Sequence, residues 1–296
     1  MMRYTKLFDE LKTIAHPFAI DRVVAHMAKI VEHELPAQSV DVFFQPPQAK
    51  EIVCWHRKSH GKAYDNSHAA ALAAFHRGQN RNSGNLFAYT LRARAIPFGV
   101  ITAHLTKDHV SVDERLLMLI DYYALLLYSE KLSFLANRDR LTHLYNRGYL
   151  FQTLERWAET GDISIIMMDI DHFKHYNDRY GHQTGDMVLR KLAVTLRREF
   201  RDALIGRYGG EEFLLAFKNG NESQVAAVME RIRSLVAMTD FSTKDYSLRI
   251  TLSLGGSIYR HVRDDINDCI GRADKALYES KHAGRNRAMM AHEASA

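Results

Sequence analysis

Cysteine, proline and long hydrophobic runs are scarce in this sequence. Only two cysteines, Cys54 and Cys269, occur in 296 residues, which argues against a disulfide framework and favours a reducing compartment. Five prolines exclude long linker-like tracts. The most hydrophobic stretch, 116–128, is interrupted by Asp121 and is shorter than the roughly 20 apolar residues of a membrane span. The first residues lack the apolar core of a secretory signal, so we expect a cytoplasmic chain without a transmembrane segment.

The charge balance is modest. There are 40 basic and 35 acidic residues, which gives a net charge of +5 and a sequence pI near 9.1. This excess of positive charge favours anionic ligands. Nucleotides satisfy it as well as nucleic acid does, and we expect no nucleic-acid partner. The length predicts two domains, because a domain typically has about 150 residues.

The first 110 residues alternate between helical and strand patterns. The expected elements are a helix over 4–34 with a break at Pro17, strands 39–45 and 51–57, a helix 67–78, and strands 85–93 and 98–105. Residues 91–105, LRARAIPFGVITAHL, resemble the central hairpin of GAF domains. The resemblance implies that residues 1–110 form a GAF-like α/β sensory domain, with a PAS domain as the open alternative. Its signal, a small molecule or a protein, is unknown.

Histidine is enriched in this half of the chain. Nine of the 16 histidines lie in residues 1–109, which invites a metal or haem hypothesis. No closely spaced histidine pair there has a supporting carboxylate, so we interpret them as scattered surface residues. Cys54, next to Trp55, is interpreted as a small apolar residue of a strand and not as a redox switch.

Residues 111–138 predict one long helix that connects the two halves. Ser111 or Asp113 can cap it, and it continues for about 25 residues without Gly or Pro. An apolar stripe runs along it, formed by Leu116, Ile120, Tyr123 and Leu127. We expect this stripe to pair with a second copy as a short coiled coil. Packing of the helix on its own domain is the alternative.

The second half, 139–296, predicts an α+β domain of the ferredoxin-like βαββαβ type. The expected elements are a helix 147–160, a strand 162–171, a helix 185–200, a hairpin 204–217, a helix 223–238, a strand 248–259 and a helix 266–284.

Acidic residues end the first strand and follow a glycine pair in the hairpin. Asp169 and Asp171 close the apolar run IIMMDID, and Glu211 and Glu212 follow Gly209-Gly210 in RYGGEEF. The two glycines permit the positive φ of a tight turn and let an anion approach the backbone. Carboxylates at strand ends hold Mg²⁺, which prefers oxygen ligands. If the two strands are neighbours, these carboxylates can bind one or two Mg²⁺ ions.

Five ordered motifs between residues 139 and 287 carry a family resemblance. They are D-x-L-T-x-L-x-N-R at 139–147, DIDHFKHYNDRYGHQTGD at 169–186, RYGGEEF at 207–213, ITLSLGG at 250–256 and ADKALYESKHAGRN at 273–286. This half resembles the GGDEF-domain family of diguanylate cyclases in its GGEEF spelling. The resemblance implies a nucleotidyl cyclase (palm-type) fold and condensation of two GTP into cyclic di-GMP and two pyrophosphates by a homodimer.

The resemblance also implies the site. Asp169, the carbonyl of Ile170, Glu211 and Glu212 would bind two Mg²⁺ (or Mn²⁺) ions, and Glu211 would be the catalytic carboxylate. Which glutamate holds which ion stays open, because adjacent side chains of a strand point to opposite faces. The substrate-binding residues would be Phe173, Lys174, Asn177, His182, Asp186, Gly209, Gly210, Lys281 and Arg285. Asn177 and Asp186 would read guanine, whereas His182 can equally have a structural role.

One departure from the family concerns its product-inhibition motif, R-x-x-D. The matching positions hold Phe200 and Ala203, and Arg201 and Asp202 are adjacent instead. We therefore expect no allosteric product site. Two other functions stay in view: a non-catalytic nucleotide-binding module, and a cyclase that makes a mixed cyclic dinucleotide. The intact site residues argue against the first and Asp186 against the second.

Overall fold

The computed structural model describes residues 17–291 except 47–48, 109 and 244–245. The chain divides into two compact units, Met1–Ala136 and Asn137–Ala296. The helix expected before Pro17 lies outside the described residues. Within the described ranges, no helix combines the length and the apolar character that crossing a bilayer requires.

The described residues of the first unit form one antiparallel sheet and three helices. Its elements are α2 (Pro17–Glu34), β1 (Ala37–Phe44), β2 (Val53–His56), α3 (Gly61–Arg77), β3 (Arg81–Ser83), β4 (Leu86–Ala93), β5 (Ile96–Leu105) and α4 (Glu114–Asn137). The strand order is β2-β1-β5-β4-β3, and each neighbouring pair is antiparallel. The strands that the sequence predicts are present, together with β3, which was not predicted.

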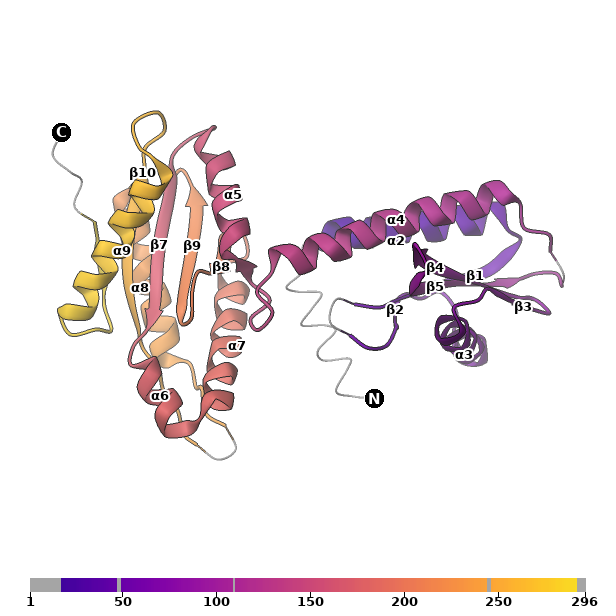
Figure 1. The fold of residues 1–296 in the computed structure, drawn as a ribbon, viewed down its shortest axis with the longest axis horizontal. Helices are drawn as coiled ribbons and strands as arrows, with labels where there is room; N and C mark the ends of the chain where they lie inside the picture. The colour runs from indigo at the N-terminus through magenta and orange to yellow at the C-terminus, as the bar shows by residue number, and fades with distance from the viewer. Residues whose placement is uncertain (1–16, 47–48, 109, 244–245, 292–296) are drawn as a thin grey trace. The chain divides into compact units, whose positions relative to one another are not determined.

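Helices cover both faces of this sheet (Figure 1). Because side chains alternate along a strand, Val40, Val42 and Phe44 of β1 pack against α2 and α4, whereas Phe43 packs against α3. Helix α3 begins six residues before the predicted start at Ser67. Its first turn is polar, and this hides the helical period in the sequence.

Helix α4 confirms the predicted connecting helix but not the role of its stripe. Asp113 accepts a hydrogen bond from the Arg115 amide at 3.0 Å and caps the helix. The side chains of Leu116, Ile120 and Leu127 are buried in the core of the first unit. The expectation that this stripe pairs with a second copy is therefore wrong, because it covers the unit's own sheet.

The second unit contains a six-stranded sheet. Its elements are β6 (Tyr145–Asn146), α5 (Arg147–Ala158), β7 (Ile163–Ile170), α6 (Phe173–Tyr180), α7 (His182–Glu199), β8 (Leu204–Arg207), β9 (Glu212–Lys218), α8 (Glu222–Met238), β10 (Leu252–Tyr259), α9 (Ile266–His282) and β11 (Ala288–Met290). The order is β11-β10-β7-β9-β8-β6. The four central strands are antiparallel and follow the predicted βαββαβ pattern. The short edge strands β6 and β11 were not predicted.

Two helices cover each face of this sheet (Figure 1). Ile166, Met168 and Ile170 of β7 pack with α7 and α8, and the alternate residues pack with α5 and α9. The sheet is therefore buried on both sides, and its strand ends are the places where polar side chains can gather.

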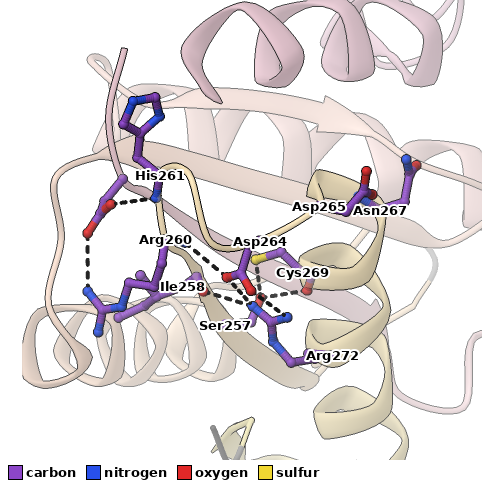
Figure 2. Close-up of polar contacts among 10 residues, drawn as sticks. Ser257, Ile258, Arg260, His261, Asp264, Asp265, Asn267, Cys269 and Arg272 are labelled. Atoms are coloured by element: carbon purple, nitrogen blue, oxygen red, sulfur yellow. Dashed lines mark hydrogen bonds and ion pairs between the residues drawn. The ribbon is translucent and has the colours of Figure 1, made fainter. Parts of the chain in front are cut away.

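A polar network closes one end of this sheet, where β10 leads into α9 (Figure 2). The Arg272 guanidinium contacts Asp264 at 2.7 Å and donates to the Ile258 carbonyl at 3.0 Å. The Ser257 hydroxyl donates to the Cys269 carbonyl at 2.7 Å. Burial raises the pKa of the Cys269 thiol to about 11, which makes it an unreactive structural residue. The opposite end of β7 and β10 carries the predicted site.

Candidate active site

The predicted carboxylates come together where β7 ends and β9 begins. The two strands are antiparallel, and Asp169 is directly opposite Glu212 in the register. Glu211 lies in the bend just before β9. The Asp169 residue is only 7% exposed. The sheet thus places three carboxyl groups at one strand end, as the spacing of the two acidic motifs predicts.

The bend before β9 is braced by Arg207. Its guanidinium donates to the Gly210 carbonyl at 2.7 and 2.9 Å and contacts the Asp139 carboxylate at 3.2 Å. Neither Gly209 nor Gly210 has a positive φ, so the expectation that the turn needs glycine for its backbone angles is wrong. A Cβ at Gly209 would lie 2.6 Å from Glu212 Oε2, so a larger residue there would displace the Glu212 carboxylate. At Gly210 no atom lies within 4 Å of a built Cβ.

Lys281 connects the last turn of α9 to this carboxylate group. Its Nζ lies 2.8 Å from Asp169 Oδ2. Burial is the main cause that raises the pKa of Asp169 to about 6; Lys281 opposes this shift, and the negative charges of Glu211 and Glu212 contribute to it. One lysine therefore does not compensate the negative charge of the three carboxylates.

The chemistry of this group fits a hard divalent cation. Three carboxylates supply only oxygen donors, and their mutual repulsion is relieved by a positive ion. Over the described residues, no three His, Cys, Asp or Glu side chains converge as a ready-made ligand cluster. The fit to a divalent cation therefore rests on the donor type and the charge of these side chains.

Asp171 has a role that the sequence analysis did not assign. Its carboxylate accepts hydrogen bonds from the Thr251 and Ser253 hydroxyls, each at 2.6 Å, and from the Asn286 amide at 2.9 Å. It is 3% exposed. It therefore ties the end of β7 to β10 and to the loop that carries Arg285. Asp169 and Asp171 are two residues apart, a spacing that would put both on one face of a continuing strand. Their roles differ because β7 ends at Ile170, so Asp171 lies just beyond the strand and contacts β10.

The loop after α9 has the predicted helix-ending geometry. Gly284 has φ +113°, and Arg285 follows with φ +62°. The Arg285 amide donates to the Ser280 carbonyl at 3.1 Å. A basic residue thus lies on each side of the helix end, Lys281 before it and Arg285 beyond it.

Helix α6 starts directly after the strand end. His172 has φ +58°, which turns the chain from β7 into the helix. Phe173 is buried in the core, and Lys174 is exposed. The first backbone N–H groups of a helix favour anions, so this turn is suited to phosphate oxygens.

Asn177 lies where α6 meets α7. A Cβ built at Gly185 would overlap Asn177 Oδ1, so the glycine allows the two helices to approach. That same oxygen is buried without a hydrogen-bond partner among the described residues. Asp186 contacts Arg190 at 3.6 Å and stays about half exposed, and His182 is exposed at the start of α7. An unsatisfied amide next to an accessible carboxylate suits a ligand with several N–H donors.

Comparisons with known proteins identify the family of the second half of the chain. Residues 136–287 match the family described as "Diguanylate cyclase, GGDEF domain". Diguanylate cyclase A of Treponema denticola is 38% identical over 173 residues, which cover 55% of this chain and 47% of that protein. Diguanylate cyclase DgcP of Pseudomonas aeruginosa is 38% identical over 156 residues, covering 50% of this chain and 23% of that protein. The chain spans about half or less of the length of these relatives.

A solved structure is similar over the same region. The coiled coil and GGDEF domain of DgcB from Caulobacter crescentus, in complex with c-di-GMP, has a TM-score of 0.55 and 33% identity, and the match covers 60% of this chain and all of that one. Its isolated GGDEF domain has a TM-score of 0.50 and 38% identity, covering 53% of this chain and 96% of that one. With its family match over half of the sequence and its carboxylates at the expected strand ends, this chain belongs to the GGDEF-domain family.

Proposed function

We propose that the chain is a diguanylate cyclase that condenses two GTP molecules into cyclic di-GMP and releases two pyrophosphates. The observation that carries the proposal is the group formed by Asp169, Glu211 and Glu212, with Lys281 at 2.8 Å from Asp169. The family and its relatives support the same reaction. A mixed cyclic dinucleotide is less well supported, because Asp186 suits guanine.

The roles of the carboxylates follow from their chemistry. Asp169, the Ile170 carbonyl, Glu211 and Glu212 would hold Mg²⁺ or Mn²⁺, with two ions per site. Such ions neutralise a triphosphate, polarise the α-phosphoryl group and lower the pKa of the attacking 3′-hydroxyl. Glu211 accepts the proton of that hydroxyl, as a positioned carboxylate can.

The remaining residues bind and orient GTP. The start of α6 with Phe173 and Lys174, together with Lys281 and Arg285, faces the phosphates. Asn177 and Asp186 accept hydrogen bonds from the guanine edge, with His182 bordering them. Gly209 and Gly210 let the nucleotide approach the hairpin backbone. In each of two identical steps, a 3′-oxygen forms a bond to the α-phosphorus of the other GTP and pyrophosphate leaves.

The reaction requires two copies of the catalytic unit. One site activates one 3′-hydroxyl, so the second GTP must be presented by a second chain. Helix α4 offers a surface for this pairing. An exposed apolar stripe runs along it at intervals of four, three and seven residues and contains Met118, Tyr122, Leu125 and Leu132. We assign the homodimer contact to this stripe, since the stripe first predicted is buried.

The dimer assignment is tested by Leu125→Glu, which places a charge on a side chain that is now 62% exposed. We expect a monomer in sedimentation experiments and loss of cyclic di-GMP synthesis. The matched control is Met238→Glu, which alters an apolar residue that is 72% exposed outside α4. A dimer that survives in Leu125→Glu would contradict the assignment.

Two further parts of the proposal concern regulation. The first unit, with its antiparallel sheet between helices, serves as a GAF-like sensory domain that controls dimer geometry through α4. The R-x-x-D positions hold Phe200 and Ala203, so the usual product site is missing. Inhibition by micromolar cyclic di-GMP that Arg201→Ala abolishes would show this second point to be wrong.

The reaction itself is tested with purified protein, GTP and Mg²⁺, followed by chromatography of the nucleotides. We expect cyclic di-GMP from the wild type and from Glu155→Gln, which changes an exposed glutamate of α5. Glu211→Gln should form none. GTP binding without turnover in the wild type would instead favour a nucleotide-binding module.

A further inference from the structure

The first unit contains a cavity of about 570 Å³ between α3 and the sheet. Volumes of this size are typical of small-molecule sites. The cavity is independent of the carboxylate site, because all of its lining residues belong to the first unit. They are Gln38, Ser39, Lys62, Ala63, Asn66, Ala69, Ala70, Arg81, Ser83, Asn85, Leu86 and His104.

The floor of the cavity is a row of residues across three strands. Ser39 of β1 and Leu86 of β4 both lie opposite His104 of β5 in the register. His104 is 8% exposed, and its Nε2 is 2.7 Å from the Ala63 carbonyl of α3. This hydrogen bond fixes the distance between the helix and the floor.

The cavity exists because α3 presents small side chains to this part of the sheet. Ala63, Asn66, Ala69 and Ala70 recur at helical spacing along the wall. On the same face of the sheet, the ring of Phe43 instead stacks with Tyr64 and His68 of α3 and fills the space. The gap at the alanines is thus a consequence of the residue sizes along one helix.

The lining is basic and rich in hydrogen-bond donors. Lys62 and Arg81 carry positive charge, and no acidic side chain is among the lining residues. Neither cation forms an ion pair with another of the residues that the structure describes. Amide groups of Gln38, Asn66 and Asn85 and the hydroxyls of Ser39 and Ser83 surround them. Cations without an ion-pair partner, together with neutral hydrogen-bond donors, are suited to bind an oxyanion such as a phosphate or a carboxylate.

We propose that this cavity binds a small organic anion through a phosphate or carboxylate group, with Lys62 and Arg81 as its charged contacts. Ser39 and Asn66 donate to the remaining oxygens, and the alanine wall contacts the apolar part of the ligand. The floor lies near the end of β5, and the chain continues from there towards α4. This site is therefore placed to report a metabolite to the helix that we assign to dimer pairing.

The test measures binding to the full chain by calorimetry, without GTP or Mg²⁺, with inorganic phosphate and citrate as probes at matched ionic strength. We expect at least one probe to bind, and about tenfold weaker binding for each cation removed in Lys62→Ala and Arg81→Ala. The control Lys29→Ala changes an exposed lysine of α2 on the other face of the sheet and should bind like the wild type. Tighter binding of phosphate or of citrate identifies the group.

Hydrogen exchange shows where in the chain the anion binds. Bound anion should protect the amides of residues 61–70 and 81–86 in the wild type and not in the Lys62→Ala, Arg81→Ala double variant. Absence of binding by both probes at tens of millimolar would overturn the proposal, as would equal affinities in the double variant and the wild type. Because no nucleotide is present, this result is separate from success or failure of the proposed cyclase reaction.

Discussion

Replacing Asp169 by Asn should stabilise the second unit while it abolishes catalysis. In the folded chain without metal, burial and the charges of Glu211 and Glu212 raise the pKa of this carboxyl to about 6. Above that pH the carboxyl is ionised in the native state, and its raised pKa means that this ionisation lowers the stability of the fold. An asparagine keeps an acceptor for Lys281 but carries no charge, so it removes this cost.

The magnitude follows from the pKa difference. An increase from the ordinary value of 3.8 to about 6 corresponds to roughly 3 kcal/mol of lost stability above pH 6. Solvent and side-chain relaxation reduce such energies, so we expect a gain of about 1 to 2 kcal/mol for Asp169→Asn. For a unit of this size, that raises the melting temperature by about 3 to 6 °C.

The sign of the pH dependence gives a second readout. The native state binds more protons than the unfolded chain between about pH 4 and 6, so the wild type loses stability as pH rises through this window. Thermal melts in chelator-containing buffer should show the advantage of Asp169→Asn growing from pH 4 to 6 and then staying constant. Asp178→Asn, an exposed change on α6, is the control. A less stable Asp169→Asn, or a pH-independent difference, would refute the reasoning.

Three further substitutions test the surroundings of the site. Asp171→Asn replaces one acceptor oxygen by an NH₂ group that cannot accept from the three donors around it, so it should lower the free energy of unfolding in urea by about 1 to 3 kcal/mol and raise KM for GTP. If both values are unchanged, Asp171 has no positioning role. Lys281→Met removes the cation from Asp169 and should weaken binding of a fluorescent GTP analogue about tenfold, whereas unaltered binding would exclude Lys281 from the phosphate site. Gly185→Ala should destabilise the α6–α7 contact by about 1 to 3 kcal/mol, measured against Gly271→Ala, where a Cβ has free space and a helical alanine is favourable.

The sequence predicts most of the fold because the long elements have clear periods. The strand β7 and the helices α8 and α9 have the predicted type and nearly the predicted bounds. The two- and three-residue strands β3, β6 and β11 are too short to show any period, and they form only because a neighbouring strand offers an edge. Their existence is decided by tertiary pairing.

Helix α4 shows why helical periodicity does not identify the side of a helix that packs against the sheet. Its sequence is apolar on two sides, one with Leu116 and Ile120 and one with Met118 and Leu125. Both sides have helical spacing, so the sequence alone cannot tell which one covers the sheet. The position of α4 against the sheet decides this, and it leaves the second side exposed.

The sequence predicts some contacts of the candidate site and misses others. The order of the motifs predicts that the acidic end of β7 lies beside the acidic start of β9. The pairing of Asp169 with Glu212 confirms this. The contact of Lys281 with Asp169 joins residues 112 positions apart, and nothing local signals it. The brace from Arg207 to Asp139 and the clamp at Asp171 also depend on long-range packing. The identity of the metal and the assignment of each glutamate stay predictions.

The most direct test of the central claim is a crystal structure of the chain with Mg²⁺ and a GTP analogue that lacks the 3′-hydroxyl. The account predicts a metal bound by Asp169 and at least one of the two glutamates. It also predicts phosphates between the start of α6 and Lys281, and guanine against Asn177 and Asp186. A nucleotide bound elsewhere, for example in the cavity of the first unit, or a metal away from Asp169, would contradict it.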